Sequence, residues 1–377
     1  MTDWNAWASG ELDALRAVHR FREPVPFDGD GPDGVVRGRR VVSFASNDYL
    51  GLAAHPQVRA AAITAIERFG TGAMASRLIV GTRSLHRELE QQLAQWKCTE
   101  NALVFSSGYS ANLGVLTTLG AADVTLFSDE LNHASLIDGC RLSKARTIIY
   151  RHLDLAHLAA LLKQTAGRKI VITESVFSMD GDSAPLPELA QLCIEHGALL
   201  VLDEAHAVLG PKLSPIRNLQ VLHVGTLSKT LGSLGGFVAG PSRLIELLVN
   251  RARTFIFTTA LSPADTAAAL AALRICESNE GDRLRMKLRS LIDLLRPGHP
   301  SAIIPIIIGE DSAALAAAAQ LREAGIHVPA IRPPTVPKGT SRLRVALSAA
   351  HSEAMVVVLR DALAQIAVAP RNVASNA

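Results

Sequence analysis

The sequence predicts an α/β fold with a mainly parallel sheet that is covered by helices on both faces. Six short apolar runs recur between residues 101 and 225, and helical patterns separate the first three. Each run is apolar at consecutive positions, which is typical of strands buried between two helical layers. The chain has 377 residues, 48% of them hydrophobic, so it is long enough to bury a core of this kind.

The predicted strands are the runs at 101–105, 124–127, 146–150, 169–173, 198–203 and 221–225. The helical patterns after the first three are at 109–119, 133–143 and 155–163. Alternating strands and helices predict βαβ units, whose crossovers keep neighbouring strands parallel.

Changes in composition and in the pattern of predicted elements along the sequence indicate three regions. Residues 1–40 contain a helix-like segment and then a connector rich in Pro, Gly and Asp, "FREPVPFDGDGPDGVVRGRR". Residues 41–240 contain the predicted sheet, and residues 241–377 are expected to form a smaller α+β domain. The elements expected in this last region are helices at 263–278 and 282–296, apolar runs at 302–309, 326–331 and 342–348, and two further helices, one of them closing the chain.

Charge and cysteine usage exclude several classes of protein. The 38 basic and 35 acidic residues are scattered, so no basic stripe indicates nucleic acid or a membrane surface as a partner. The four cysteines are far apart in the sequence, which favours reduced thiols in a cytoplasmic protein. The N-terminus lacks the apolar stretch of a signal peptide. The charge-free run at 101–122 is rich in Ser, Gly, Asn and Thr, so a strand and helix explain it better than a membrane span.

The string "DEAH" at 203–206 is also a helicase signature, but a helicase needs a phosphate-binding loop, G-x-x-x-x-G-K-[ST], upstream of it. No such loop is present: the fragment "GTLSKT" at 225–230 lacks the second glycine and lies downstream. Asp203 instead ends a predicted buried strand, and ligands of parallel sheets bind outside the carboxyl ends of the strands. Asp203 is therefore either a turn-capping residue or part of a binding site.

Lys229 follows the next predicted strand, in a loop of small residues. An isolated lysine is usually a solvated surface charge, but in an enclosed site its pKa falls and its amine becomes a nucleophile. Lys229 and Asp203 together fit pyridoxal phosphate (PLP) chemistry, in which Lys forms a Schiff base and Asp keeps the pyridine nitrogen protonated.

The cofactor's phosphate would need donors and its ring a partner. The stretch "SSG" at 106–108 lies between a predicted strand and a helix start, where free backbone N–H groups can hold an anion. His133 also stands at a predicted helix start and can reach the same side of the sheet. Either feature alone would fit an ordinary α/β turn or a capping histidine.

With these residues the sequence resembles the α-oxoamine synthases, PLP enzymes with the type I aminotransferase fold. The motifs that carry the resemblance are "SNDYLGL" (46–52), "SRLIVGT" (76–82), "VFSSGYSAN" (104–112), "NHASLIDG" (132–139), "ESVFSMDGDSAPL" (174–186), "DEAH" (203–206), "GTLSKTLGSLGG" (225–236), "FTTALSP" (257–263) and "PPTVPKGTSRLRVALSAAH" (333–351).

The resemblance implies a PLP-dependent decarboxylating condensation of an amino acid with an acyl thioester. The expected substrates are L-alanine and a pimeloyl thioester, carried by CoA or by a carrier protein. The same chemistry on glycine and acetyl-CoA remains an alternative, because "GAMASRLIVGT" is partly like glycine C-acetyltransferase. A transaminase of the same fold is a second alternative.

The resemblance also implies roles for single residues around the ring. Lys229 would carry the Schiff base and take the Cα proton, Asp203 would pair with the pyridine nitrogen, His133 would stack on the ring, and His206 would bond its phenolic oxygen. The remaining cofactor contacts would come from Gly108 and Tyr109 at the phosphate, from Ser178 and Thr226, and from Thr258 or Thr259 of a partner subunit in a homodimer. No metal ion is expected.

The substrates would be bound by His133 together with three further residues. Arg344 would clamp the amino-acid carboxylate, whereas Arg342, two positions earlier, is expected to be solvated on an edge strand. Arg20 and Thr335 match positions for the acyl substrate. The loop after His206, "AVLGPKLSPIRNLQ", is shortened and lacks the glycine-rich run of many members, so the resemblance assigns it no role.

Overall fold

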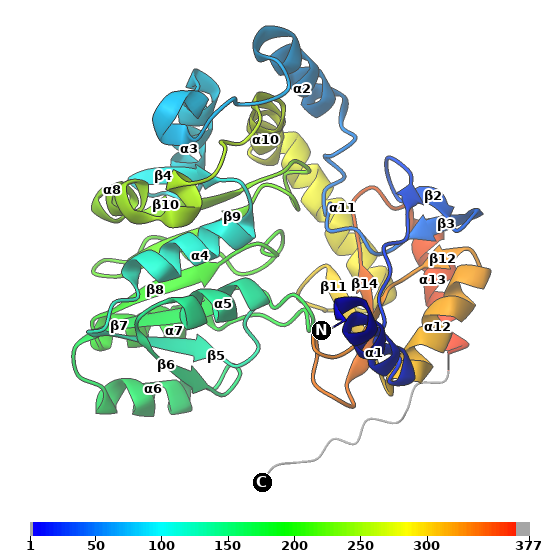
Figure 1. Ribbon diagram of the computed structural model, residues 1–377. Coiled ribbons are helices and arrows are strands. Elements are labelled where there is room, and N and C mark those ends of the chain that lie inside the picture. Colours follow the sequence, from blue (N-terminus) through cyan, green and yellow to red (C-terminus); the bar gives the residue numbers. More distant parts are fainter. Residues whose placement is uncertain (1–2, 367–377) are drawn as a thin grey trace.

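The computed structural model describes residues 3–366, and its largest element is a seven-stranded sheet in the order β4-β10-β9-β8-β7-β5-β6 (Figure 1). All six predicted strands belong to it: β4 (Asn101–Phe105), β5 (Val124–Asp129), β6 (Arg146–Tyr150), β7 (Arg168–Glu174), β8 (Ala198–Asp203) and β9 (Gln220–Thr226). The strand pairs from β9 to β6 are parallel. The prediction of a mainly parallel α/β sheet is therefore confirmed.

Strand β10 (Gly236–Gly240) was not predicted from the sequence. It runs antiparallel between β4 and β9, and its five residues are all buried. Glycine at both ends and only three apolar residues between them leave no strand pattern in the sequence. Because the strand follows β9 directly, the loop that joins them, 227–235, contains Lys229.

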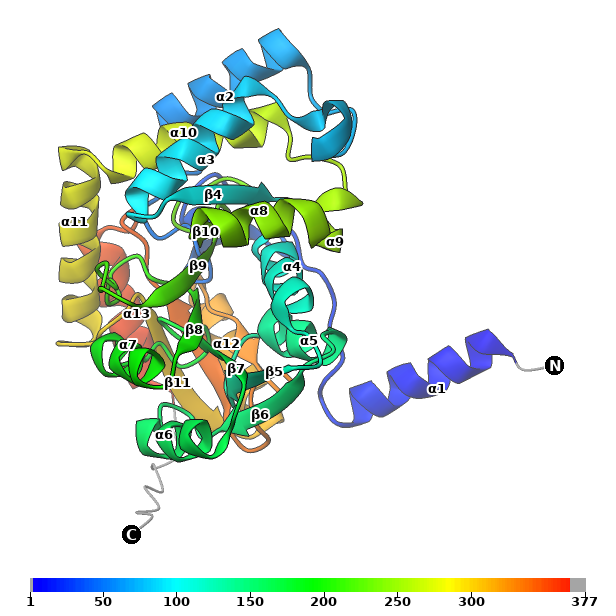
Figure 2. The ribbon, with the colours of Figure 1, turned by 90° about the vertical axis from the view of Figure 1, so that its left-hand side faces the viewer.

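Helices cover both faces of the sheet (Figure 2). On one face α4 (Gly108–Leu119), α5 (Ala134–Leu142) and α8 (Ser242–Arg251) share an apolar core with the strands. On the other face α6 (Leu155–Gln164) and α7 (Leu186–Glu195) do so. Beyond β4 lie α2 (Pro56–Phe69), the π-helix Arg77–Gly81, α3 (Ser84–Trp96) and α10 (Pro263–Cys276), while α9 (Arg253–Ile256) packs against α4 and α8.

The C-terminal region has its own antiparallel sheet, β11-β14-β13, flanked by helices. Its elements are α11 (Asn279–Leu295), β11 (Ile303–Gly309), α12 (Asp311–Glu323), β13 (Ala330–Ile331), β14 (Ser341–Ala346) and α13 (Glu353–Ala364). The apolar run predicted at 326–331 is split, because β12 (Ile326–His327) pairs with β3 and only β13 pairs with β14. Pro329 stands between the two short strands and has no N–H to donate.

Part of the predicted N-terminal connector forms strands. The segments β1 (Phe27–Asp28), β2 (Asp33–Val36) and β3 (Arg39–Ser43) form one sheet with β12 from the C-terminal region. This pairing links the first region of the chain to the last. The three regions 1–40, 41–240 and 241–377 remain a proposal for the domain limits, and the residues beyond 366 lie outside the described part.

Helix α1 (Trp4–Ala17) extends away from the body of the protein, and none of its side chains is buried (Figure 2). Within residues 3–366, no helix combines the length and the apolar character needed to cross a membrane.

Candidate active site

The carboxyl ends of the parallel strands carry two buried carboxylates. Asp203 ends β8 and Glu174 ends β7, and the two residues are partners in the register of these strands. Asp203 accepts hydrogen bonds from Asn112 Nδ2 at 2.7 Å and from the backbone N–H of Ala205 at 2.9 Å. Burial raises the pKa of Glu174 well above its usual range, and the charge of Asp203 adds to this effect. Asp203 therefore lies at the strand edge where ligands of such sheets bind.

Lys229 reaches this edge from the loop between β9 and β10. Its Nζ atom lies 2.9 Å from Nε2 of His206. Burial lowers the pKa of Lys229, while the charges of Asp203 and Glu174 oppose the shift. The loop bends at Gly232, whose φ is +58° and where a Cβ atom would come within 2.3 Å of the backbone nitrogen of Ala53. Glycine at this position lets the loop approach residue 53 closely.

His206 is held between Lys229 and a tyrosine. Its Nδ1 atom lies 2.5 Å from the hydroxyl of Tyr49, which is fully buried. Burial lowers the pKa of His206 well below its usual range, and the charges of Lys229 and Arg344 lower it further. Burial also raises the pKa of Tyr49 to about 12. At neutral pH His206 is therefore an uncharged imidazole and Tyr49 keeps its proton.

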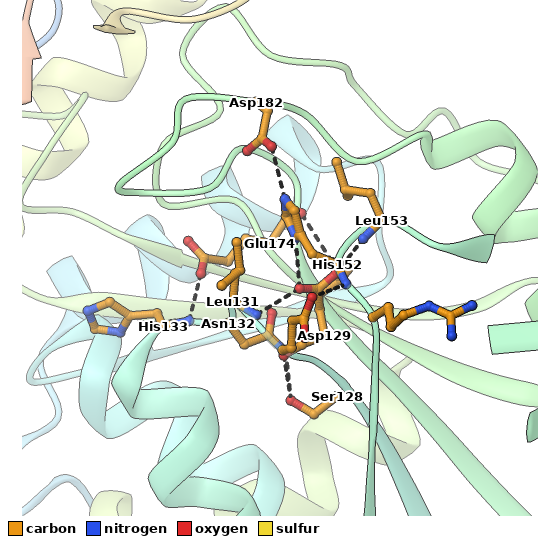
Figure 3. Close-up of polar contacts among 12 residues, drawn as sticks. Ser128, Asp129, Leu131, Asn132, His133, His152, Leu153, Glu174 and Asp182 are labelled. Carbon is orange, nitrogen blue, oxygen red and sulfur yellow. Dashed lines mark hydrogen bonds and ion pairs between the residues drawn. The ribbon is translucent and has the colours of Figure 1, made fainter. Parts of the chain in front are cut away.

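His133 is the N-cap of α5, as expected from the sequence, and its backbone N–H donates to Glu174 Oε1 at 2.6 Å (Figure 3). Its Nδ1 atom lies 2.8 Å from Ser135 Oγ, which accepts from Asn112 Nδ2 at 2.9 Å. Asn112 also donates to Asp203, so a continuous polar chain links His133 to that carboxylate. Burial lowers the pKa of His133, while Asp203 opposes the shift.

The start of helix α4 lies against the end of β9. Ser107 is the N-cap, and the N–H groups of Gly108 and Tyr109 stand in the first turn. A Cβ atom at Gly108 would lie 3.4 Å from Cβ of Thr226, and one at Gly236 would come within 2.4 Å of the Gly108 nitrogen. The glycines thus permit a close approach of helix start and strand ends, and the free N–H groups there suit an anion. The Tyr109 ring extends away, and its hydroxyl donates to Asp138 at 2.5 Å.

Arg344 enters the same region from β14. It is buried, its Nε atom donates to the carbonyl of Ser178 at 2.6 Å, and both terminal nitrogens lie 3.2 Å from Asn47 Oδ1. Its charge lowers the pKa of both His206 and Tyr49, so it lies in their electrostatic neighbourhood. The structure therefore brings Lys229, Asp203, His133, His206 and Arg344 to one region.

The expectation for Arg342 was wrong. Instead of being solvated, Arg342 is 3% exposed, and it pairs with Asp180 at 2.5 Å. Strand β14 is the central strand of its sheet, between β11 and β13, rather than an edge strand. Its arginines therefore face the turn after Ser178 instead of water.

The residues expected at the acyl substrate lie in two segments that touch. Arg20 pairs with Asp311 at 3.0 Å, while Arg332 donates to the carbonyls of His19 and Phe21 on either side of it. The backbone N–H of Thr335 donates to the carbonyl of Arg332 at 3.2 Å, so Thr335 belongs to the segment that contacts residues 19–21. Within residues 3–366, neither side chain is hydrogen-bonded to the group around Lys229.

Thr258 and Thr259 lie in the segment that leads from α9 to α10, where Thr259 forms an isolated bridge with Ser76. In the described part of the chain, no hydrogen bond joins them to Lys229 or to the start of α4. Their expected role is to reach the cofactor of a partner subunit.

Several polar neighbours in the site were not singled out from the sequence, namely Asn47, Tyr49, Asn112 and Glu174. All four occur in motifs that carry the family resemblance, "SNDYLGL", "VFSSGYSAN" and "ESVFSMDGDSAPL". Glu174 also directly follows the strand predicted at 169–173, as Asp203 ends the strand predicted at 198–203.

These groups fit PLP. Asp203 still has acceptor capacity, since a carboxylate can accept about four hydrogen bonds and two are made here. The Lys229 amine, the His133 imidazole and the start of α4 supply the nucleophile, ring partner and anion donors that the cofactor needs. The buried Oδ1 of Asn112 and Oγ of Ser175 have no partner in the protein, so polar capacity remains near the site. Over the described residues, no group of His, Cys, Asp or Glu side chains is arranged to hold a metal ion.

Comparisons with known proteins agree with this arrangement. The family model for aminotransferase class I and II matches residues 39–363. The 8-amino-7-oxononanoate synthase of Anaeromyxobacter dehalogenans is 51% identical, with 96% of this chain and 95% of that protein covered. The enzyme of the same name from Geobacter sulfurreducens is 45% identical, with 95% and 97% covered.

Solved structures extend the likeness to the fold. A variant of serine palmitoyltransferase from S. paucimobilis, solved with a PLP–myriocin adduct, superposes with a TM-score of 0.89 at 30% identity, covering 96% of this chain and 97% of that one. The 8-amino-7-oxononanoate synthase of Francisella tularensis superposes with a TM-score of 0.72 at 27% identity, covering 86% and 96%. The chain thus belongs to the aminotransferase class I and II family and, within it, to the α-oxoamine synthases, PLP-dependent acyltransferases of the type I fold.

Proposed function

We propose that this chain condenses L-alanine with a pimeloyl thioester to give 8-amino-7-oxononanoate, CO2 and a free thiol, as a step in biotin biosynthesis. The observation that carries the proposal is the 51% identity, over nearly the full length, to a protein named 8-amino-7-oxononanoate synthase. The grouping of Lys229, Asp203 and Arg344 at one site supports it, because the reaction needs an amine, a ring partner and a carboxylate clamp.

Bound PLP supplies an electron sink that weakens the bonds to Cα of an attached amino acid. Asp203 fits the position of partner to the pyridine nitrogen, because it is an ionisable carboxylate at the strand edge with Asn112 and Ala205 fixing its two oxygens. His133 fits the face of the ring, since it caps α5 and is tied through Ser135 and Asn112 to the same carboxylate.

Lys229 is suited to move a proton at Cα. Burial lowers its pKa, so more of the amine is free at neutral pH than for an exposed lysine. His206, 2.9 Å away, holds the Nζ atom in place and is itself uncharged, so it does not repel the ammonium form. Lys229 can therefore accept the Cα proton and return a proton to the product carbon.

Arg344 is suited to bind the carboxylate of L-alanine. Its Nε atom is engaged by Ser178, and its two terminal nitrogens face Asn47 with further N–H donors to offer. A planar fork of donors matches a carboxylate in a bidentate way. The same pairing holds the carboxylate that is later lost as CO2.

The acyl thioester would bind where the segments of Arg20 and Thr335 meet. The Arg20 guanidinium, paired with Asp311, is a cation that a pimeloyl carboxylate or a carrier phosphate can use. Either CoA or a carrier protein would present the same thioester, and an assay with both donors separates them.

We also propose that the chain works as a homodimer in the cytoplasm. The π-helix, the residues just before it and the segment before α10 expose large apolar side chains, among them Ile79 at 73%, Met74 at 76% and Phe257 at 69%. An apolar patch of this kind favours an interface, and Thr258 and Thr259 lie beside Phe257. The four free cysteines, three of them buried, are in keeping with a reducing compartment.

The test is a substrate matrix with the purified, PLP-loaded protein. L-alanine and glycine are each crossed with acetyl-CoA, pimeloyl-CoA and a pimeloyl carrier protein, and free thiol and amino ketone are quantified. We expect turnover to be highest with L-alanine and a pimeloyl donor. Higher turnover with glycine and acetyl-CoA would assign the alternative specificity, and formation of pyruvate without thiol release would assign a transaminase.

A further inference from the structure

A tight turn at 177–182, called the 177–182 turn below, joins β7 to the approach of α7. It is closed by two backbone bonds, from Phe177 N–H to the Asp182 carbonyl at 3.0 Å and from Gly181 N–H to the Phe177 carbonyl at 2.9 Å. The turn presents the Ser178 carbonyl, which accepts from Nε of Arg344 at 2.6 Å. The turn therefore supplies one of the contacts that orient the Arg344 guanidinium, and Asn47 supplies the others.

Residues of the C-terminal region hydrogen-bond to the turn from one side. Arg342 donates to the carboxylate of Asp180 at 2.5 Å and to the Met179 carbonyl at 3.2 Å. Ser301 Oγ donates to the Gly181 carbonyl at 2.7 Å. Gly181 has a φ of +71°, and a Cβ atom there would come within 2.1 Å of the Ile303 carbonyl. On this side the turn is closely fitted to β11 and β14.

His152, just after β6, contacts the turn from the other side (Figure 3). Its Nε2 atom lies 2.9 Å from Asp182 Oδ2, and its Nδ1 atom lies 2.9 Å from Asp129 Oδ1. The ring also meets Phe177 edge-on, with centroids 4.4 Å apart. His152 thus joins the end of β5 to both ends of the turn.

Asp129 makes the far end of this connection rigid. It is fully buried and accepts from the backbone N–H groups of Leu131 at 2.9 Å and Leu153 at 3.0 Å (Figure 3). Burial alone would lower the pKa of His152, but the hydrogen bonds to Asp129 and Asp182 raise it to about 10. At neutral pH the imidazole is therefore charged and donates through both nitrogens at once.

We propose that His152 is a positioning residue for the amino-acid substrate, which with Asp182 holds the 177–182 turn so that Ser178 aims the Arg344 guanidinium at the substrate carboxylate. This inference rests on the proposed function in one respect, that Arg344 binds that carboxylate. It adds a residue that touches neither cofactor nor substrate and acts through the turn.

The His152–Asp182 pair lies near the surface, so its effect on the 177–182 turn can be tested without disturbing the core. The His152 side chain is 17% exposed and that of Asp182 is 41% exposed, so this contact is at the surface end of the network. Only the Asp182 end of the pair is exposed, and an ion pair that is open to solvent adds little to stability, about 0–1 kcal/mol. Asp182→Asn removes the charge while keeping the side-chain shape, so it perturbs the turn and leaves the core packed.

The experiment measures the dissociation constant of L-alanine for the PLP-loaded protein by titration calorimetry. We expect Asp182→Asn to weaken it about three- to thirtyfold, the range typical of coupling through packed networks. The KM for the acyl thioester, the PLP absorbance and the thermal midpoint should stay as in the wild type. His152→Gln should also weaken alanine binding. The fold-loss of affinity in the double variant should be smaller than the product of the two single fold-losses, because both residues act through one contact.

A matched control is Asp123→Asn, which removes an exposed carboxylate from its pair with Arg168 at the opposite end of the same strands. Alanine binding should be unchanged in this variant. Unchanged alanine affinity in Asp182→Asn would overturn the inference, and so would equal losses for alanine and the acyl thioester. If the wild type binds glycine or another amino acid instead of L-alanine, the proposed substrate is wrong, and the same comparison with that amino acid tests the positioning role.

Discussion

The Nζ atom of Lys229 lies 2.9 Å from Nε2 of His206, whose Nδ1 atom lies 2.5 Å from the hydroxyl of Tyr49. The three groups come from segments far apart in the sequence, and all are shielded from water. The charges of Asp203, Glu174 and Arg344 all act on this amine: the two carboxylates raise its pKa and the guanidinium lowers it. Lys229 is consequently the lysine that we expect PLP to modify.

Reduction with borohydride should fix PLP on a peptide that contains Lys229. Lys229→Ala should lower turnover by roughly 10²–10⁴-fold, because the residual protein lacks its acid–base group, and it should still bind PLP without a covalent link. Peptide mapping and absorbance check the two parts. Attachment to another lysine, for example Lys97, would refute the assignment.

Arg344→Lys should weaken L-alanine binding by roughly one to two orders of magnitude, since a charged pair shielded from water contributes about 1.5–3 kcal/mol and lysine cannot reproduce the fork. The PLP absorbance and the acyl-thioester KM should stay almost unchanged. Arg342→Lys serves as the comparison, because it alters the support of the turn at Asp180 and Met179 and not the guanidinium of Arg344, and its effect on alanine should be smaller. A larger effect at Arg342 than at Arg344 would mean that the wrong arginine was chosen.

The sequence was sufficient to predict the parallel sheet and the place of Asp203, Lys229 and His133 on it. Strand ends in such a sheet meet at one edge, so residues after consecutive strands are neighbours whatever their separation along the chain. Arg344 came from family resemblance, because β14 belongs to a separate sheet and no local pattern connects it to that edge.

The environment of Arg342 could not be predicted in the same way. Its burial depends on Asp180 and Met179, which lie more than 160 residues earlier, and on the pairing of β14 with both its neighbours. The same holds for Glu174 and Asn112. Their place in the site depends on hydrogen bonds to His133 and Asp203, which lie on other elements. Strand β10 could not be predicted because its two glycines have low strand propensity. Pairing with β4 and β9 on either side stabilises it instead.

Acid should remove the stability that a buried cluster of Glu204, Lys97 and His223 gives to the fold. Glu204 Oε2 lies 2.9 Å from Lys97 Nζ and 3.0 Å from His223 Nδ1. Burial would raise the pKa of Glu204, but Lys97 and His223 lower it to about 2. Because the folded pKa is below that of an unfolded glutamate, about 4.3, this carboxylate stabilises the protein above that pH, and the effect is lost as the pH falls toward about 2.

Glu204→Gln should therefore reduce the free energy of unfolding at pH 7 by an amount on the order of 3 kcal/mol, and the difference from wild type should shrink between about pH 4 and pH 2. Urea denaturation across this range measures it. Glu246→Gln, at an exposed pair with Arg243, is the control and should show little difference at any pH. A difference in Glu204→Gln that persists at pH 2 would contradict this account.

The proposed homodimer predicts complementation between two inactive chains. Lys229→Ala and a Thr258→Ala/Thr259→Ala double variant should each be inactive alone, and mixing them should restore activity in heterodimers, because one of the two shared sites is then intact. Activity assays after mixing and subunit exchange check this. Ile79→Glu, which places a charge on the exposed apolar patch, should shift the protein toward monomers with low activity. Fully active monomers at low concentration would rule out the shared site.

The measurement that tests the central claim most directly follows the carboxyl carbon of L-alanine. The PLP-loaded protein is incubated with carboxyl-labelled L-alanine, with and without a pimeloyl thioester, and the label is traced. We predict release of labelled CO2 only when the thioester is present, in a one-to-one ratio with free thiol and with an amino ketone that carries no label. Label retained in pyruvate, or labelled CO2 released equally without the thioester, would contradict a decarboxylating condensation.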